Sequence, residues 1–329
     1  QKSQLGGGSP MIRGFSTNRL LISVDGVRMN NAIFRGGNVQ NVISIDPFAI
    51  QNTEVTLGAG SVVYGSDAIG GVMSFYTKKP QLSYKDELYL RGNALVRYAT
   101  ASDEKTGHFD MNLGYKKWAF LTSVSYTDFD DLRMGSNGPI DYIRSEYVVR
   151  ENGEDVMVSN SNPLVQIPTG YDQINLMQKA RYEPSDNLNF DLGLYYSTTS
   201  DYARYDRLLR YNGDNLRSAE WNYGPQQWFM GNLQLTKLSS SSNLYDKIQA
   251  TLAYQNFKES RADRDFQSPF REVRAESVDA ISFNLDLEKE LNTKTSIFYG
   301  LEYLHNTVGS EGSEENIETN ENVPNVTRY

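Results

Sequence analysis

The strongest constraint on the fold of this 329-residue chain is a series of segments in which apolar and polar side chains alternate. In residues 188–196, for example, Leu and aromatic residues occupy every even position and mostly polar residues the odd ones. Successive side chains of a β-strand point to opposite faces, so this period of two predicts strands with one apolar and one polar face. Nine such strands are predicted, near residues 86–99, 106–116, 118–129, 172–183, 187–200, 225–238, 245–258, 273–290 and 294–306.

The connections between these strands favour a membrane β-barrel. Short links alternate with long ones, which places the tight turns at one end of the sheet and the long loops at the other, as in outer-membrane barrels. The long links are expected near residues 100–105, 130–171, 201–224, 259–272 and after residue 306. No stretch approaches the ~18 apolar residues of a membrane-spanning helix. A large soluble β-domain shows the same alternation and is the alternative.

Both ends of the chain suggest a piece of a longer protein. Residue 1 is Gln rather than Met, and residues 306–329 form a polar, acidic segment that we interpret as a loop. A barrel edge left open in lipid leaves unpaired backbone groups at several kcal/mol each, so barrels close. Nine strands followed by a loop therefore lead us to expect further strands beyond Tyr329.

The composition excludes several classes of function. A formal net charge of −9 argues against nucleic acid as a partner. The chain has no Cys and only two His, His108 and His305, which argues against thiolate chemistry and multi-histidine metal sites. The motifs Gly-x-Ser-x-Gly and His-Glu-x-x-His are absent, and we expect no enzyme activity. His108 has the parity of Asp110 and Asn112, on the face expected to line the lumen.

The first eighty residues follow a different pattern and predict a small, separate α+β unit. Short β-branched runs at residues 20–24, 53–57 and 71–77 predict strands, with irregular segments rich in Gly and Asn between them. The turn pair Asp25-Gly26 ends the first of these strands.

A run of short motifs between Met11 and Lys79 is the most specific signal in the chain. In order, the motifs are Ile12-Arg13-Gly14, Asp25-Gly26-Val27-Arg28-Met29-Asn30, Ile45-Asp46-Pro47, Thr53-Glu54-Val55 and the glycine-rich run from Gly58 to Val72. This run closely resembles the plug domain of TonB-dependent outer-membrane receptors. The resemblance implies a membrane β-barrel of the 22-strand antiparallel type with a small α+β plug domain in its lumen. Residues 1–80 are then the plug, without its N-terminal part, and residues 81–329 are the first part of the barrel, with about nine strands.

The resemblance also implies roles for individual plug residues. In the family, the positions matching Arg13 and Glu54 pair with charges on the barrel wall, and ordinary solvated charges are the alternative. A phosphate-binding loop is disfavoured because the residues after Gly60 are poor helix openers. The turn motif, whose glycines allow positive φ and close backbone approach, consists of Gly58, Tyr64, Gly65, Asp67, Gly70 and Gly71. Tyr64 and Asp67 are equally explained as plain turn residues.

The loop at residues 30–41 is expected to meet the substrate, because the corresponding loop of relatives rises towards the outside. It offers an aromatic face, one cation and several amides, which suit a partly anionic chelate. The residues concerned are Asn30, Phe34, Arg35, Asn38 and Gln40. A polar loop without a ligand role is the alternative.

One cluster of carboxylates has the spacing of a loop that holds Ca²⁺. Asp128, Asp130 and Asp131 lie at the start of the longest predicted loop, although a solvated turn explains them as well. No other metal or cofactor is expected.

By resemblance, the function is active import of a scarce nutrient across the outer membrane of a Gram-negative bacterium. The partners implied are TonB with ExbB and ExbD, acting through a TonB box before Gln1, together with outer-membrane lipid, lipopolysaccharide and a surface lipoprotein. An iron chelate of the siderophore or haem type is the first substrate class. Cobalamin, a glycan or a peptide is the alternative within the family, and a passive porin, an adhesin or a soluble β-rich binding protein is the alternative outside it.

Overall fold

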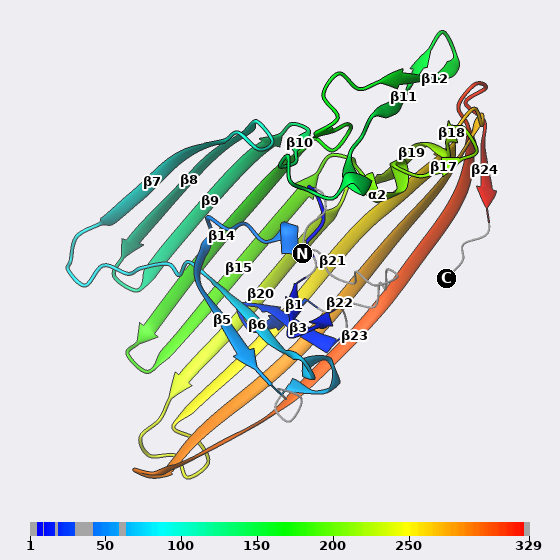
Figure 1. The fold of residues 1–329 in the computed structure, drawn as a ribbon. Coiled ribbons are helices and arrows are strands. Elements are labelled where there is room, and N and C mark those ends of the chain that lie inside the picture. The colour runs from blue at the N-terminus through cyan, green and yellow to red at the C-terminus, as the bar shows by residue number, and fades with distance from the viewer. Residues whose placement is uncertain (1–4, 9, 17–18, 30–41, 59–63, 326–329) are drawn as a thin grey trace.

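The computed structural model describes residues 5–8, 10–16, 19–29, 42–58 and 64–325. Two β-sheets dominate these residues, and the smaller sheet lies against one face of the larger (Figure 1). In the part of the chain that is described, no helix has the length and apolar character needed to cross a membrane.

The small sheet is mixed and four-stranded. Its order is β4 (Val27–Arg28), β3 (Leu20–Val24), β6 (Gly71–Thr77) and β5 (Ile50–Leu57), with β3 parallel to β6 and the other neighbours antiparallel. Asp25 and Gly26 connect β3 to β4 and both have positive φ, as a two-residue hairpin turn requires. The short elements nearby are β1 (Met11–Ile12), β2 (Phe15–Ser16), η2 (Val42–Ser44) and η3 (Ser66–Ala68). The three predicted strands of this region are confirmed.

The large sheet is an antiparallel meander in which chain neighbours pair, apart from two excursions. The strands along its main path are β7 (Tyr89–Ala99), β8 (Glu104–Tyr115), β9 (Trp118–Phe129), β14 (Tyr171–Ser185), β15 (Leu188–Thr199), β20 (Gln227–Leu238), β21 (Lys247–Asp265), β22 (Phe270–Asn292), β23 (Thr295–Asn316) and β24 (Asn322–Asn325). Two further strands of the same sheet, β16 (Tyr202–Ala203) and β19 (Ser218–Tyr223), lie off this path, and β19 pairs with β21. All nine predicted strands are therefore present, and the short β24 is added at one edge.

The two excursions lie at the same end of the large sheet (Figure 1). The first, between β9 and β14, contains β10 (Leu132–Arg133), η4 (Ile140–Tyr142), β11 (Glu146–Glu151), β12 (Glu154–Ser159) and β13 (Val165–Gln166). The second, between β15 and β20, contains β16 (Tyr202–Ala203), α2 (Tyr205–Leu208), β17 (Tyr211–Asn212), β18 (Asn215–Leu216) and β19 (Ser218–Tyr223). The long links predicted near 130–171 and 201–224 are confirmed.

Three other predicted long links are wrong. β7 and β8 are joined by residues 100–103 alone, β21 and β22 by residues 266–269, and the segment after residue 306 continues as strand to Asn316. Charged side chains in these extensions pair across the strands, as in Arg271–Glu315 at 3.1 Å. Because ladder hydrogen bonds need no apolar side chains, a polar and charged sequence can continue a strand.

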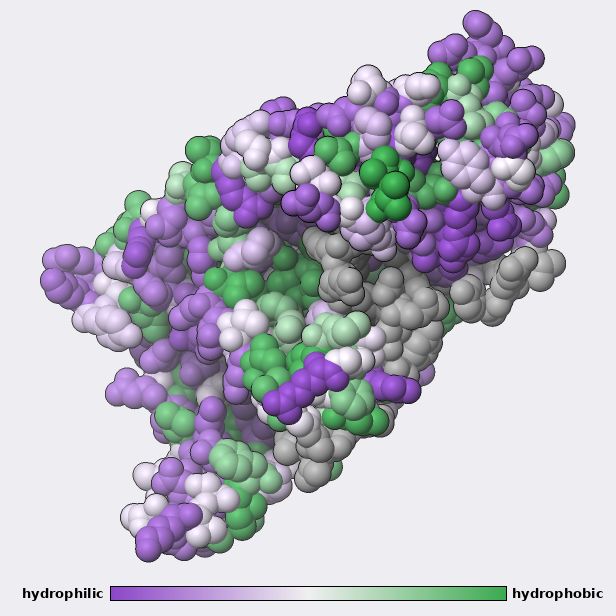
Figure 2. All heavy atoms as spheres, viewed as in Figure 1, coloured by the Kyte–Doolittle hydropathy of each residue, from purple (hydrophilic) through white to green (hydrophobic). Residues whose placement is uncertain are grey.

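The two faces of the large sheet differ in chemistry. On β8, His108, Asp110 and Asn112 are buried on the face towards the small sheet, while Phe109 and Met111 are exposed on the other. Hydrophilic side chains gather at the end of the molecule that carries β11, β12 and β24 (Figure 2). The strand faces thus follow the alternation read from the sequence.

Candidate functional site

An apolar core lies between the two sheets. The small sheet and the segment before β5 contribute Ile22, Val24, Val27, Ile45 and Ala49. The large sheet contributes Leu121, Met177, Tyr195, Trp228, Met230 and Ala253. Burial of these side chains fixes where the small sheet sits, and the polar contacts around the core fix its orientation.

Asp25, in the β3–β4 turn, is the centre of the first polar cluster. Its Oδ2 accepts hydrogen bonds from Lys179 Nζ at 2.8 Å, from Thr77 Oγ1 at 2.6 Å and from the Tyr195 hydroxyl. Its Oδ1 accepts the Thr77 N–H at 2.9 Å. Burial acts to raise the pKa of Asp25, but Lys179 and the hydrogen bonds outweigh it and lower that pKa below its usual value. The carboxylate is therefore charged and holds β3, β6, β14 and β15 together.

Arg28, on β4, forms the second polar cluster. Nε and Nη2 bind both carboxylate oxygens of Glu302 on β23, at 3.1 and 2.8 Å. Nη1 donates to Asp67 at 3.1 Å, and Nη2 also donates to the Tyr64 carbonyl at 2.7 Å. One guanidinium thus connects the wall of the large sheet with the turn before β6. We call Asp25, Arg28, Lys179, Tyr195 and Glu302 the plug seat.

The predicted turn motif surrounds this second cluster. Gly58 and Gly65 have positive φ, Tyr64 is exposed and Asp67 is half-buried. Gly71 has a φ of 144°, and a Cβ there would lie 2.7 Å from the Thr56 carbonyl oxygen. A Cβ on Gly70 would lie 2.3 Å from Cβ of Phe15. Close approach thus requires glycine at both positions, whereas a functional role for the motif stays a prediction.

The structure places the other predicted plug residues as follows. Arg13 and Glu54 are exposed, and within the described ranges neither forms an ion pair. Glu54 accepts only a 3.4 Å hydrogen bond from Tyr76 there, so their pairing with the barrel stays a prediction. The predicted substrate residues Asn30, Phe34, Arg35, Asn38 and Gln40 lie outside the described residues.

Sequence reasoning missed Asp25 and Arg28 as interface residues. Both stand in the motif Asp25 to Asn30, but Asp25 was interpreted only as a turn residue. Their main partners, Lys179 and Glu302, follow 154 and 274 residues later. The sequence alternation of β14 and β23 could place Lys179 and Glu302 on the polar faces of their strands, but it contains no signal that pairs them with Asp25 and Arg28.

The Ca²⁺ site considered for the first long loop is not formed. Asp131 Oδ1 accepts the N–H groups of Thr169 and Gly170, at 2.5 and 3.0 Å. Asp130 accepts the N–H of Asp131, and Asp128 faces Lys105 at 3.9 Å. Among the described residues no group of three or more His, Asp or Glu side chains is arranged to hold a metal ion. These carboxylates order the loop by local hydrogen bonds instead.

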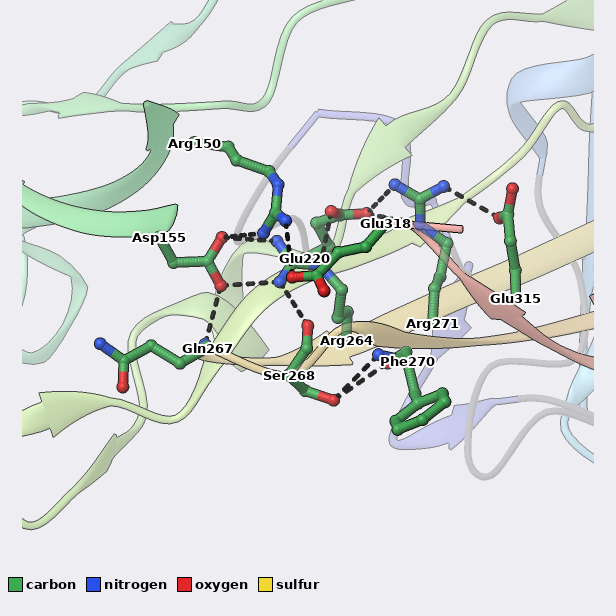
Figure 3. Close-up of polar contacts among 10 residues, drawn as sticks. All are labelled: Arg150, Asp155, Glu220, Arg264, Gln267, Ser268, Phe270, Arg271, Glu315 and Glu318. Atoms are coloured by element: carbon green, nitrogen blue, oxygen red, sulfur yellow. Dashed lines mark hydrogen bonds and ion pairs between the residues drawn. The ribbon is translucent and has the colours of Figure 1, made fainter. Parts of the chain in front are cut away.

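A separate network of charges joins the two excursions to the long strands (Figure 3). The side chain of Asp155 on β12 is fully buried and binds Nη1 and Nη2 of Arg264 at 2.7 and 2.9 Å. It also accepts the Gln267 N–H at 2.7 Å and a bond from Arg150 at 3.2 Å. Burial acts to raise the pKa of Asp155, but hydrogen bonds from Arg264 and Gln267 lower it below its usual value.

The network continues through Glu220 on β19. This carboxylate accepts Arg264 Nε at 2.8 Å and Arg271 Nε at 2.8 Å, and Arg271 reaches Glu315 on β23 (Figure 3). Arg150 also reaches Glu318, beyond the end of β23, at 3.4 Å. We call Arg150, Asp155, Glu220, Arg264 and Arg271 the rim network. It ties the β11–β12 hairpin, β19 and the ends of β21 to β23 into one unit.

Comparison with known proteins identifies the small sheet. Residues 1–72 match the model of the TonB-dependent Receptor Plug Domain. This match confirms the predicted resemblance of the first region to the plug of TonB-dependent receptors. The chain is 44% identical over 85 residues to the vitamin B12 transporter BtuB of Vibrio vulnificus (strain CMCP6), a match that covers 25% of this chain and 13% of that protein.

Solved structures agree in fold over nearly the whole chain. The copper transporter OprC superposes with a TM-score of 0.72 at 15% identity, covering 97% of this chain and 42% of OprC. The FrpB iron transporter from Neisseria meningitidis superposes with a TM-score of 0.62 at 16% identity, covering 90% of this chain and 42% of FrpB. The large sheet therefore has the fold of part of a plugged β-barrel, and the small sheet has the fold of its plug. The chain spans less than half the length of these structures.

Proposed function

We propose that this chain supplies the plug and the first barrel strands of an active nutrient importer in the outer membrane of a Gram-negative bacterium. We further propose a division at residue 80, since β6 ends at Thr77 and β7 begins at Tyr89. The observation that carries the import function is the plug seat, in which charged groups of the plug contact a polar barrel wall. Such contacts hold the plug closed, and the separated charges can be hydrated when the plug moves.

The proposed energy source is TonB with ExbB and ExbD, whose pull rearranges the plug. The link between Arg28 and the turn at Tyr64 to Asp67 supports this proposal, because movement of that turn breaks the contact with Glu302. Lipopolysaccharide and a surface lipoprotein complete the proposed partners. Arg13 and Glu54 are proposed to pair with barrel strands beyond this chain.

The proposed substrate is an iron chelate of the siderophore or haem type. Its support is the chemistry of the loop at residues 30–41, in which Arg35 supplies a cation and Phe34 an aromatic face for an anionic chelate. Cobalamin is the second candidate, supported by the 44% identity with the vitamin B12 transporter over 85 residues. A glycan or a peptide is the third candidate, which is favoured if neither a ferric chelate nor cobalamin accumulates.

Uptake by whole cells tests this proposal. Cells that produce the complete receptor are given labelled ferric chelates or labelled cobalamin, with and without a functional tonB gene. We expect TonB-dependent accumulation of one ferric chelate, reduced in the Arg35→Gln variant and retained in Arg19→Gln, which alters an exposed plug arginine. Accumulation of cobalamin instead of a ferric chelate would show that cobalamin, and not an iron chelate, is the substrate. Uptake without TonB, together with steady ion conductance in planar bilayers, overturns the importer and favours a porin.

A further inference from the structure

The part of the second excursion that contains α2 and the β17–β18 hairpin is a basic segment in an acidic chain. Residues 204–217 contain four arginines and two aspartates and hence carry a net charge of +2, whereas the whole chain carries −9. The arginines are Arg204, Arg207, Arg210 and Arg217. None of them belongs to the plug seat or to the rim network, so neither cluster explains why positive charge gathers in this segment.

A single carboxylate lies close to the first of these arginines. Asp206 Oδ1 accepts a hydrogen bond from Arg204 Nε at 2.8 Å, whereas Arg207 Nε lies 3.8 Å from Asp206 Oδ2. The Nε of Arg207 is buried and has no hydrogen-bond acceptor in the part of the chain that is described. The Arg210 side chain is exposed and forms no ion pair within the same residues. Two guanidinium groups are therefore left without a hydrogen-bonded carboxylate.

The backbone holds the three guanidinium groups near one another. The Arg207 N–H donates to the Arg204 carbonyl at 3.0 Å, and the Arg210 N–H donates to the Arg207 carbonyl at 3.3 Å. Residues three apart in such turns are neighbours on one side. Burial, together with the positive charges of Arg204 and Arg210, lowers the pKa of Arg207. The like charges repel one another, and an anion bound between them removes that repulsion.

The arginines lie beside the plug. Tyr202, two residues before Arg204, packs so closely on Gly6 that a Cβ there would lie 2.5 Å from the tyrosine ring. The Arg204 guanidinium lies over the rings of Trp221 and Tyr223 on β19, 5.1 and 5.9 Å from their centroids, and Nη1 donates to the Tyr223 hydroxyl at 3.0 Å. Arg204 is thus fixed against β19, next to a segment of the plug.

We propose that Arg204, Arg207 and Arg210, which we call the α2 arginines, bind an anionic carboxylate or phosphate group of the imported molecule. A guanidinium holds such a group through two parallel hydrogen bonds. The inference rests on the proposed import function and deepens it by naming the charge of the substrate and the residues that receive it. Lipopolysaccharide carries phosphate of the same chemistry, but the contact between Tyr202 and Gly6 places this segment beside the plug.

Titration calorimetry of the complete receptor in detergent, at low salt, tests the site with citrate, pyrophosphate and lipopolysaccharide. We expect citrate or pyrophosphate to bind, and to bind about tenfold more weakly in Arg207→Gln and in Arg210→Gln, because each variant loses a hydrogen bond between charged groups. Arg207→Lys keeps the charge and should bind more tightly than Arg207→Gln. Arg133→Gln, which alters an exposed arginine of the first excursion, should bind like the unaltered receptor.

Tryptophan fluorescence locates the bound anion. Because Arg204 lies over the Trp221 ring, an anion at the α2 arginines should change the emission of this tryptophan. The change should be absent in Trp221→Phe and should persist in Trp118→Phe, which alters a tryptophan at the opposite end of β9.

Three results overturn the site. The first is that neither citrate nor pyrophosphate binds, and the second is that both bind with unchanged affinity in Arg207→Gln and Arg210→Gln. The third is that lipopolysaccharide alone binds and is lost in these variants, which assigns the α2 arginines to the membrane surface. None of these measurements involves transport, so a receptor that fails the uptake assay can still bind the anion, and one that passes it can lack the site.

Discussion

The plug seat and the rim network both join distant parts of the chain through buried charges, but they distribute those charges differently. In the plug seat, each charged plug residue relies on one counter-ion of the barrel wall, Lys179 for Asp25 and Glu302 for Arg28. In the rim network, guanidinium and carboxylate groups alternate over several segments, and Glu220 alone binds Arg264 and Arg271.

This difference in charge arrangement fits the proposed function, in which the plug has to move and the rim does not. A buried ion pair is weak support for stability, because desolvation offsets most of the attraction, but loss of one partner is costly. With one barrel counter-ion for each charged plug residue, the plug has a defined position that the loss of a few contacts can undo. In a branched network, by contrast, each segment is held by several contacts, which suits a fixed rim in the proposed importer. The predictions below test this contrast, from the largest expected effect to the smallest.

Removal of the central rim arginine should release the β11–β12 hairpin. Arg264→Met leaves the fully buried Asp155 carboxylate without its two strongest donors, and the docked hairpin should lose about 3–5 kcal/mol. Hydrogen exchange of residues 146–159 measures the loss. Arg271→Met is the control, because this side chain is 30% exposed and its removal should cost less than about 1 kcal/mol. An equal loss of hydrogen-exchange protection in the two variants would show that Arg264 is no more important to the hairpin than Arg271.

Loss of the lysine of the plug seat should loosen the plug without affecting the rim. Lys179→Met leaves Asp25 with neutral hydroxyl and backbone donors only, at a cost of about 3 kcal/mol. The denaturant concentration at which the β3 and β6 amides lose protection should fall, while the β11–β12 amides keep theirs. Lys258→Met, which alters an exposed lysine of β21, should change neither. Loss of protection at the rim in Lys179→Met contradicts the independence of the two regions.

Acid should release the rim hairpin through Asp155. The pKa of this carboxyl is lower in the folded protein than in the unfolded chain, so its contribution is fully present above the usual value near 4. The contribution is lost as the pH falls from about 4 through the lowered pKa, by up to about 1.4 kcal/mol per pH unit. Protease sensitivity of the hairpin between pH 6 and pH 2.5 measures this loss. Asp155→Asn should show a flatter profile, and an unchanged profile excludes Asp155 as the group that titrates.

A conservative change at Arg28 should give the smallest effect. Arg28→Lys keeps the charge but loses the two-point contact with Glu302 and one of the bonds to the turn, which should cost about 1 kcal/mol. Exchange of the amides at residues 64–68 should rise about fivefold. Arg19→Lys, at an exposed plug position, is the control. An effect as large as that of Lys179→Met means that the two clusters of the plug seat are equally important.

Much of the barrel could be predicted because the alternation that defines each strand lies within that strand's own sequence. The alternation at 188–196 fixed both the extent of β15 and the face of each side chain, and the same holds for β9 and β14. The prediction was wrong for the charged ends of β21, β22 and β23 near residues 259–272 and 306–316, which were interpreted as loops. Those residues form strands because Arg271, Arg274 and Arg261 each find a carboxylate on a neighbouring segment.

The candidate site was predicted only in outline. The motif from Asp25 to Asn30 indicated the plug, yet the turn geometry of Asp25 fully accounted for its presence in the sequence. The contacts of Asp25 with Lys179 and of His108 with Ser125 and Asp46 join residues from different strands, and no periodicity links them.

The sequence by itself determined the strands and their two faces, because periodicity and turn chemistry are properties of neighbouring residues. The resemblance of its motif run indicated the plug. Only the tertiary structure decided which charges meet. Packing of the plug against the apolar core sets the position of each polar group to within hydrogen-bond distance, and a buried charge is stable only where that position supplies its partner.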